Sequence, residues 1–321
     1  MTSTRRSHGL IAVDKKAAQV LFLDPDTLET LSYIGDMPVL PHELAIDHKH
    51  GLAIDHKHGL AFIPAFGDGV HGHNPNPNHF VSVIDLESRT RIADIDLTPL
   101  QAPHTLRFGP DGLLYVCCEN SSAVAVIDPE TRSVRSVLST HSNKCHRLTI
   151  LPRRQLILTE NEEDATLSVI RIGEDEAYRM ISLPAPVAGI EHLPNEKFVV
   201  VTNALRPSLF LMDVEAGELR QEIPLKHHRK PAQILRLSPD GQWLLVVGDF
   251  EPVVTLISLP QWDQYPVAVG QKPMDAAFRP DGTTVIVANE EDGTLTEIDL
   301  VGRKPLRTVQ AGSGCETLGF F

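Results

Sequence analysis

The chain has 321 residues, and its 42 acidic against 29 basic residues give a net charge of −13. This charge disfavours nucleic acid and anionic membranes as partners and suits the binding of cations. The sequence contains no run of about 18 apolar residues, so we expect no membrane-spanning helix. The basic N-terminal residues are not followed by the apolar segment that a secretory signal requires, so we expect no signal peptide. The four cysteines have neither zinc-site nor disulfide spacing. We therefore expect a soluble, globular, cytoplasmic protein, while the composition leaves its oligomeric state open.

A short apolar strand, most often ending in Asp, recurs seven times along the chain. The copies are residues 20–24, 81–85, 124–128, 167–171, 209–213, 254–258 and 295–299. A second apolar run precedes six of them, and Pro-Asp-Gly turns begin at Pro110, Pro239 and Pro280. Each unit thus contains four short strands joined by hairpins, with a period of about 43 residues. Such a unit cannot bury its own small sheet, so neighbouring units must stack.

The repeat predicts an all-β fold, a seven-bladed β-propeller of four-stranded antiparallel blades that forms one domain over residues 1–321. The first unit lacks its innermost strand and starts directly at Gly9–Asp14. An orphan strand of the missing type, Cys315–Phe320, ends the chain. Joining the two closes the ring and removes both exposed sheet edges.

With these turns, the strand ends at Val126–Asp128 and the runs ending in Cys118–Asn120 and Val287–Asn289, the chain resembles the YVTN-repeat, lactonase-like family of seven-bladed propellers. The resemblance covers nearly the whole chain. The wider superfamily includes lactonases, lyases, isomerases and purely binding proteins, so the resemblance implies the fold and leaves the activity open.

An octapeptide, AIDHKHGL, occurs twice in tandem at residues 45–52 and 53–60. No structural repeat of a propeller has this length. Either of two histidines could therefore occupy the ring position of the second blade. His42 follows Pro41 as His104 follows Pro103, whereas His50 has the usual spacing to the next strand. One of the two histidines must lie in a loop.

The first residue of each innermost strand lies nearest the central axis on one face. Aligning the repeats places these residues at the seven ring positions: His42 or His50, His104, His146, Ala188, Gln233, Met274 and Glu316. Three imidazoles and one carboxylate from four successive blades suit a divalent transition metal, which would be zinc, iron(II) or manganese. A polar water-filled channel and metal-free acid–base chemistry are the alternatives.

Proton-transfer candidates lie on the same face. Glu160 ends a strand in the blade of His146, and the long loop 67–79 carries His71 and His73. The structural alternatives are that Glu160 lies in a turn whose side chains cap backbone amides and that the loop 67–79 is simply solvated. Arg107 and Arg147 follow ring positions and are expected to form salt bridges between blades, with a substrate carboxylate as the other possible partner. The pair His227–His228 is expected to face solvent.

These patterns favour a metal-dependent hydrolase, lyase or isomerase of the lactonase-like propeller type, acting on a small organic substrate at the channel mouth. The alternative is a propeller that binds a ligand or a protein without catalysis. The sequence names neither the substrate nor the reaction.

Overall fold

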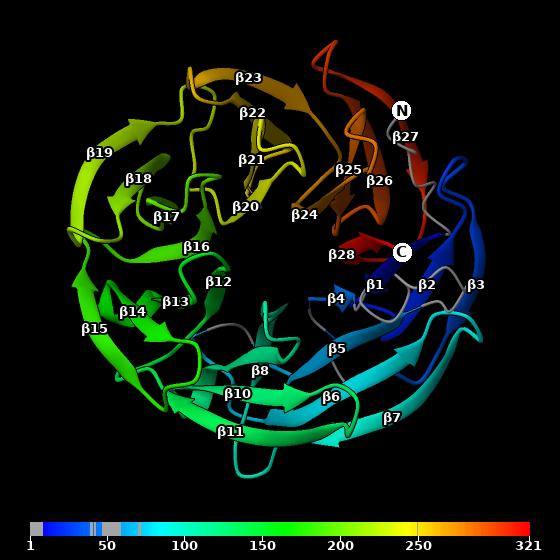
Figure 1. Ribbon diagram of the computed structural model, residues 1–321. Coiled ribbons are helices and arrows are strands. Elements are labelled where there is room, and N and C mark those ends of the chain that lie inside the picture. The colour runs from blue at the N-terminus through cyan, green and yellow to red at the C-terminus, as the bar shows by residue number, and fades with distance from the viewer. Residues whose placement is uncertain (1–8, 39–40, 42, 47–58, 70–71, 249) are drawn as a thin grey trace, which may run out of the picture.

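The computed structural model describes residues 9–38, 41, 43–46, 59–69, 72–248 and 250–321. Their strands form seven four-stranded antiparallel sheets that stand around one axis like the blades of a propeller (Figure 1). The predicted seven-bladed β-propeller is therefore confirmed. Among the described residues, no helix is long and apolar enough to cross a membrane.

The blades are numbered along the chain, and their strands are given from the axis outward. Blade 1 contains β28 (Cys315–Phe320), β1 (Leu10–Asp14), β2 (Gln19–Leu23) and β3 (Thr30–Ile34). Blade 2 contains β4 (Ala45–Ile46), β5 (Leu60–Gly67), β6 (Pro77–Asp85) and β7 (Thr90–Asp96). Blade 3 contains β8 (Pro103–Phe108), β9 (Leu114–Cys118), β10 (Ala123–Asp128) and β11 (Ser133–Ser139). Blade 4 contains β12 (Arg147–Leu151), β13 (Leu156–Asn161), β14 (Thr166–Arg171) and β15 (Ala177–Ser182).

Blade 5 contains β16 (Val187–His192), β17 (Phe198–Asn203), β18 (Ser208–Asp213) and β19 (Glu218–Pro224). Blade 6 contains β20 (Ile234–Leu237), β21 (Trp243–Gly248), β22 (Val253–Ser258) and β23 (Asp263–Ala268). Blade 7 contains β24 (Pro273–Phe278), β25 (Thr284–Asn289), β26 (Thr294–Asp299) and β27 (Lys304–Gln310). Two short 3-10 turns, η1 (Glu119–Ser121) and η2 (Glu162–Asp164), follow β9 and β13.

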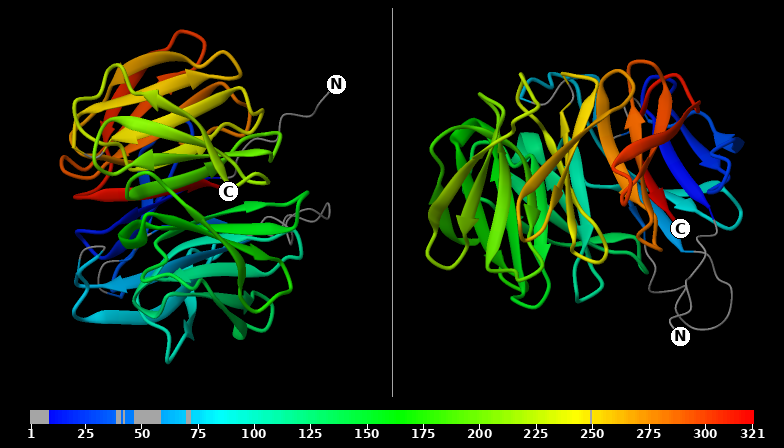
Figure 2. Two further views of the ribbon diagram at one scale, coloured as in Figure 1. Left: turned by 90° about the vertical axis from the view of Figure 1, so that its left-hand side faces the viewer. Right: turned by 90° about the horizontal axis from the view of Figure 1, so that it is seen from above.

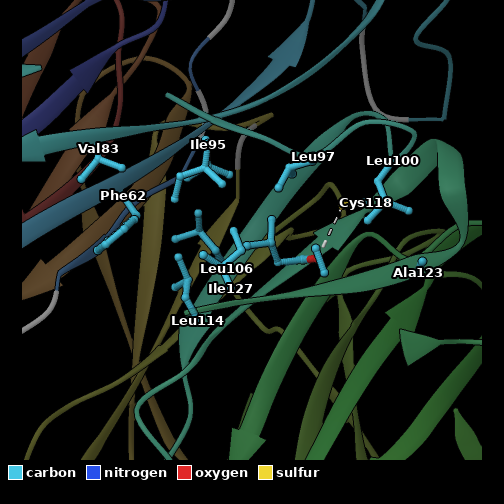
Figure 3. Close-up of a cluster of buried hydrophobic side chains, with 13 residues drawn as sticks. Phe62, Val83, Ile95, Leu97, Leu100, Leu106, Leu114, Cys118, Ala123 and Ile127 are labelled. Carbon is cyan, nitrogen blue, oxygen red and sulfur yellow. Dashed lines mark hydrogen bonds between the residues drawn. The ribbon is translucent and has the colours of Figure 1, made fainter. Parts of the chain in front are cut away.

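The hydrophobic core lies between neighbouring blades. The second strand of a blade is covered on both faces, so β9 reads as a continuous apolar run in which every residue is buried. One cluster joins blades 2 and 3 and includes Phe62, Val83, Leu106 and Ile127 (Figure 3). Each blade thus buries its apolar faces only by stacking on its neighbours, as the repeat predicts.

The repeated turn residues have local structural roles. Asp24 directly follows β2. Its Oδ1 accepts hydrogen bonds from the backbone N–H groups of Asp26 and Thr27, at 2.9 and 2.7 Å. Asp128 does the same in blade 3. In the Pro-Asp-Gly turns the glycine has a left-handed backbone, with φ of 84° at Gly112. A residue with a Cβ is disfavoured there, which explains the recurrence of glycine.

The C-terminal strand completes the first blade. β28 pairs antiparallel with β1, with Leu318 opposite Ala12 and Phe320 opposite Leu10. The backbones of Gly9 and Phe321 exchange two hydrogen bonds of 3.0 Å. The ring closure predicted from the orphan strand is therefore present.

Successive hairpins alternate between the two faces of the disc, which Figure 2 shows edge-on. One face carries the connections from the second to the third strand of each blade, and the ring positions open toward it. The connection from the first to the second strand lies on the other face. Along the sequence, residues 47–59 separate β4 from β5, whereas residues 109–113 and 279–283 separate the corresponding strands of blades 3 and 7.

Candidate functional site

Five of the predicted ring positions line a cavity at the mouth of the central channel. Its volume is about 400 Å³, and His104, Ala188, Gln233, Met274 and Glu316 are among its lining residues. His146 is 1% exposed and lies directly beside His104, with ring centroids 4.5 Å apart in an edge-on arrangement. The alignment of the repeats thus found the residues that surround the axis.

The His146 side chain contacts two carboxylates of its own blade. Its Nδ1 lies 2.6 Å from Oε1 of Glu160 and 3.5 Å from Oε2 of Glu162. The pairing of β12 with β13 places Glu160 opposite Arg147, next to His146. Burial raises the pKa of Glu160 well above its ordinary value, and the neighbouring Glu162 carboxylate raises it further. Glu160 therefore retains its proton at pH values where an exposed glutamate has lost its own.

The His104 side chain is oriented by Glu43, acting through Thr105, and the sequence analysis selected neither residue. His104 Nδ1 lies 3.2 Å from the hydroxyl oxygen of Thr105, and that hydroxyl donates a 2.8 Å hydrogen bond to Oε1 of Glu43. The Thr105 oxygen is then available to accept from Nδ1–H of His104, which places the ring proton on Nδ1. The alignment of the repeats already places Glu43 beside a ring position, because Glu43 follows His42 as Thr105 follows His104.

Glu43 also joins three blades through ion pairs. It accepts from Nη1 of Arg147 and, at 3.2 Å, from Nη1 of Arg107. Burial by itself would raise the pKa of Glu43, but the guanidinium groups of Arg147, Arg107 and Arg236 outweigh it and hold the pKa at about 2. The predicted salt bridges of Arg107 and Arg147 between blades are confirmed.

Glu316 has a different environment from the two histidines. Its Oε1 accepts a 3.0 Å hydrogen bond from Nζ of Lys15, and both residues line the cavity. Further along the inner strands, Asp275 pairs with Arg236 and accepts from Thr317 at 2.6 Å. Blades 6, 7 and 1 are thus connected by buried polar contacts much as Glu43 connects blades 2, 3 and 4.

The second blade takes the register in which His42 precedes the inner strand. Pro41 bridges to Ala65, and Ala45 pairs with Phe62 in β4 and β5. Pro103 and Arg107 make the equivalent contacts in blade 3, with Cys118 and Tyr115. His42, His50 and His71 themselves lie outside the described residues, so their participation stays a prediction.

The remaining candidates lie elsewhere. His73 is exposed and lines a separate hollow of about 330 Å³ together with Asn120 and Lys144. The expectation that His228 faces solvent is wrong, because it is 6% exposed and its Nε2 lies 2.9 Å from the hydroxyl of Thr255. The charged residues next to His228 in the sequence had suggested an exposed segment. Its imidazole instead fills the space beside Gly248.

Within the described part of the chain, no three His, Cys, Asp or Glu side chains gather closely enough to hold a metal ion. The described ligand candidates that do meet are His104 and His146, while Glu316 is ion-paired with Lys15. The predicted metal site therefore depends on donors from the segments that the structure does not describe.

No protein-family model matches the chain, and no curated protein matches it in sequence. Solved structures do share its fold. A protein of unknown function from Desulfotomaculum acetoxidans is similar with a TM-score of 0.77 and 14% identity, over 98% of this chain and 99% of that one. Hydrazine synthase from Kuenenia stuttgartiensis is similar with a TM-score of 0.67 and 17% identity, over 80% of this chain and 85% of that one. At these identities the likeness shows the seven-bladed fold alone.

Proposed function

We propose that this propeller is a metal-dependent enzyme of the lactonase-like type that acts on a small organic substrate at its channel mouth. Hydrolysis of a lactone, elimination and isomerisation all belong to this class of chemistry. The observation that carries the proposal is the pair His104 and His146, whose rings lie 4.5 Å apart. Nδ1 of His146 contacts Glu160 directly, and Nδ1 of His104 reaches Glu43 through the Thr105 hydroxyl.

The donor set fits a first-row divalent metal. When a carboxylate or a relay to one holds the Nδ1 side of an imidazole, the Nε2 side is directed to a ligand, as in many metal sites. His104 reaches Glu43 through Thr105, and His146 contacts Glu160. His42 is proposed as the third nitrogen donor, because Pro41 and Ala45 occupy the register that matches His104. A bound zinc, iron(II) or manganese ion would polarise a substrate carbonyl or activate water.

The residues of the chain supply the proton chemistry. Burial and the Glu162 carboxylate raise the pKa of Glu160, and a carboxyl group with a raised pKa is suited to general acid–base chemistry. His146 links Glu160 to the cavity region where His104 lies. Glu160 is therefore the proposed positioning and proton-holding residue, while His104 and His146 contact the reacting groups.

The buried Glu160 carboxyl group favours an enzyme over a propeller that only binds a ligand. A buried carboxyl group held in an unfavourable environment costs stability, and such groups concentrate at sites of chemistry. A binding surface needs only shape and complementary polarity, which the cavity would offer without Glu160.

Metal analysis of protein purified without a histidine tag tests the proposal. We expect about one equivalent of zinc, iron or manganese in the wild type and in His141→Ala, a control at an exposed histidine. The double variant His104→Ala, His146→Ala is expected to remain folded and to lose the metal. Wild-type protein that retains none of the three metals after incubation and dialysis would contradict the proposal.

A further inference from the structure

The cavity at the channel mouth has two chemically different sides. Blades 3 and 4 contribute His104, Arg147 and Glu162. Blades 5 and 6 contribute mainly small or apolar residues, among them Ala188, Ala204, Ala232 and Phe250, together with the polar Gln233. A polar arc and an apolar arc therefore face one space of about 400 Å³.

Arg147 is fixed by the protein at the junction of these two arcs. Its Nε donates a 3.0 Å hydrogen bond to the carbonyl oxygen of Ala188, and its Nη1 donates to Glu43. The residue is 8% exposed and still lines the cavity. These contacts leave Nη2 without a hydrogen-bond acceptor among the described residues. A rigid guanidinium with a remaining donor recognises an anionic oxygen through a charge-assisted hydrogen bond.

Long-range attraction does not explain anion binding here. The chain carries a net charge of −13, and the cations Lys15 and Lys272 at the cavity already pair with Glu316 and Glu290 at 3.0 and 2.5 Å. Recognition of an anion must therefore come from directed donors rather than from the overall field. Arg147 is the residue placed to provide them.

The apolar arc accommodates the rest of a ligand. Alanine at positions 188, 204 and 232 leaves space where a larger side chain would fill the mouth. Phe250 stands at the rim of this arc with 57% of its surface exposed, an unusual cost for a large aromatic side chain in water. Covering Phe250 with an apolar chain removes that surface from water.

We infer that the cavity takes a small monocarboxylate with an apolar tail, the carboxylate on Arg147 and the tail along blades 5 and 6 toward Phe250. This inference deepens the proposed function, because it names the substrate class of the same site. It requires no metal, since Arg147 and Phe250 make the contacts. The two proposals can therefore fail separately.

Calorimetric titration with straight-chain monocarboxylates from acetate to hexanoate tests it, with primary alcohols of equal length as the comparison. The protein is used both after chelator treatment and after zinc loading. We expect carboxylates to bind the chelator-treated protein and to gain about two- to fourfold in affinity per added methylene. Alcohols are expected to bind at least tenfold more weakly.

Two variants locate the contacts. Arg147→Lys keeps a positive charge beside Glu43 and is expected to lose the preference for carboxylates over alcohols. Phe250→Ala changes only an exposed side chain, and it is expected to flatten the dependence on chain length. Val301→Ala, at an 87% exposed residue in a turn of the opposite face, is the matched control.

Absence of carboxylate binding by the chelator-treated protein overturns the inference, and so does binding whose chain-length dependence survives Phe250→Ala. Should Arg147→Lys not fold, the Phe250→Ala series still decides. If carboxylates bind as expected while the metal analysis finds no metal, the metal-dependent function fails and this inference stands.

Discussion

His146 and Glu160 meet inside blade 4 with Nδ1 and Oε1 2.6 Å apart, and neither side chain is more than 1% exposed to solvent. An ion pair or shared proton of this kind is enclosed on all sides, so water does not screen it. The two residues are expected to behave as one unit.

A double-mutant cycle measures this coupling. We expect His146→Ala, Glu160→Ala and the double variant to give a coupling free energy of about 1–3 kcal/mol in urea unfolding. His141 and Glu176 form the matched control, with a 2.8 Å contact between side chains that are 47% and 66% exposed. Their coupling is expected to stay below about 1 kcal/mol, because solvent screens exposed pairs. Equal coupling in the two cycles would show that burial of the His146–Glu160 pair has no energetic effect.

Glu43 is expected to give the fold a distinct acid sensitivity. Its ordinary pKa of 4.5 applies to the unfolded chain, while in the folded protein, where burial would raise the pKa, the guanidinium groups lower it to about 2. A carboxyl group whose pKa is lower in the folded state stabilises the fold above its unfolded pKa, and this stabilisation is lost as the pH falls. The window is pH 4.5 down to about 2, and the contribution is on the order of 3 kcal/mol.

Glu43→Gln removes this contribution and leaves Arg107 and Arg147 without their carboxylate. We expect it to cost about 3–5 kcal/mol at pH 7, as loss of one partner of a buried ion pair does. The deficit relative to wild type should shrink between pH 4.5 and pH 2. Glu215→Gln, at an 81% exposed side chain, is the control and is expected to change stability little. A deficit that stays constant over this pH range would refute the assigned role. Urea unfolding at several pH values provides the measurement.

Ring closure through β28 is expected to contribute a large part of the stability. Leu318 and Phe320 are 6% and 7% exposed and belong to the core shared with blade 7. Leu318→Ala and Phe320→Ala should each cost about 2–5 kcal/mol, and deletion of residues 314–321 should destabilise the whole ring. Leu306→Ala, at a 53% exposed residue of β27, should cost less than about 0.5 kcal/mol. A truncated protein that melts within a few degrees of wild type is incompatible with this closure.

The fold could be predicted from the sequence because its determinants are periodic. The strand ending at Asp128 and the turn at Gly112 recur with fixed spacing, and their local hydrogen bonds and backbone angles explain why these residue types return. The orphan strand at Cys315–Phe320 likewise has only one blade to complete.

The site could be predicted only where it follows the same period. His104 and Glu316 occupy equivalent positions in their blades, so alignment placed both at the cavity. Glu43 was missed because its role comes from contacts between different blades, which no single repeat contains. The ion pair of Glu316 with Lys15 also depends on the C-terminal strand lying beside β1, a relationship between the two ends of the chain.

The tandem octapeptide offers a test of the register in blade 2. The pairing of Ala45 with Phe62 places the first copy's start in β4, and the second copy's last residue, Leu60, begins β5. The connecting residues 47–59 number thirteen, against five in residues 109–113 of blade 3. Removal of one octapeptide leaves a five-residue connection, the length found in the other blade. The sequence between the first and second strands of blade 2 is thus longer than its counterpart in blade 3 by one octapeptide.

We expect the protein lacking residues 45–52 to fold and to retain any bound metal, because one copy of the octapeptide suffices for β4 and the turn. Its stability should equal or exceed that of the wild type by up to about 1 kcal/mol, since a shorter loop costs less closure entropy. In the full chain, His42→Ala should lower metal content while His50→Ala leaves it unchanged, because Pro41 and Ala45 pair with β5 as Pro103 and Arg107 pair with β9 on either side of His104. Thermal melts and metal analysis of the three variants are the measurements. Loss of metal in His50→Ala alone would reverse this assignment, and an unfolded deletion variant would show that blade 2 needs both copies.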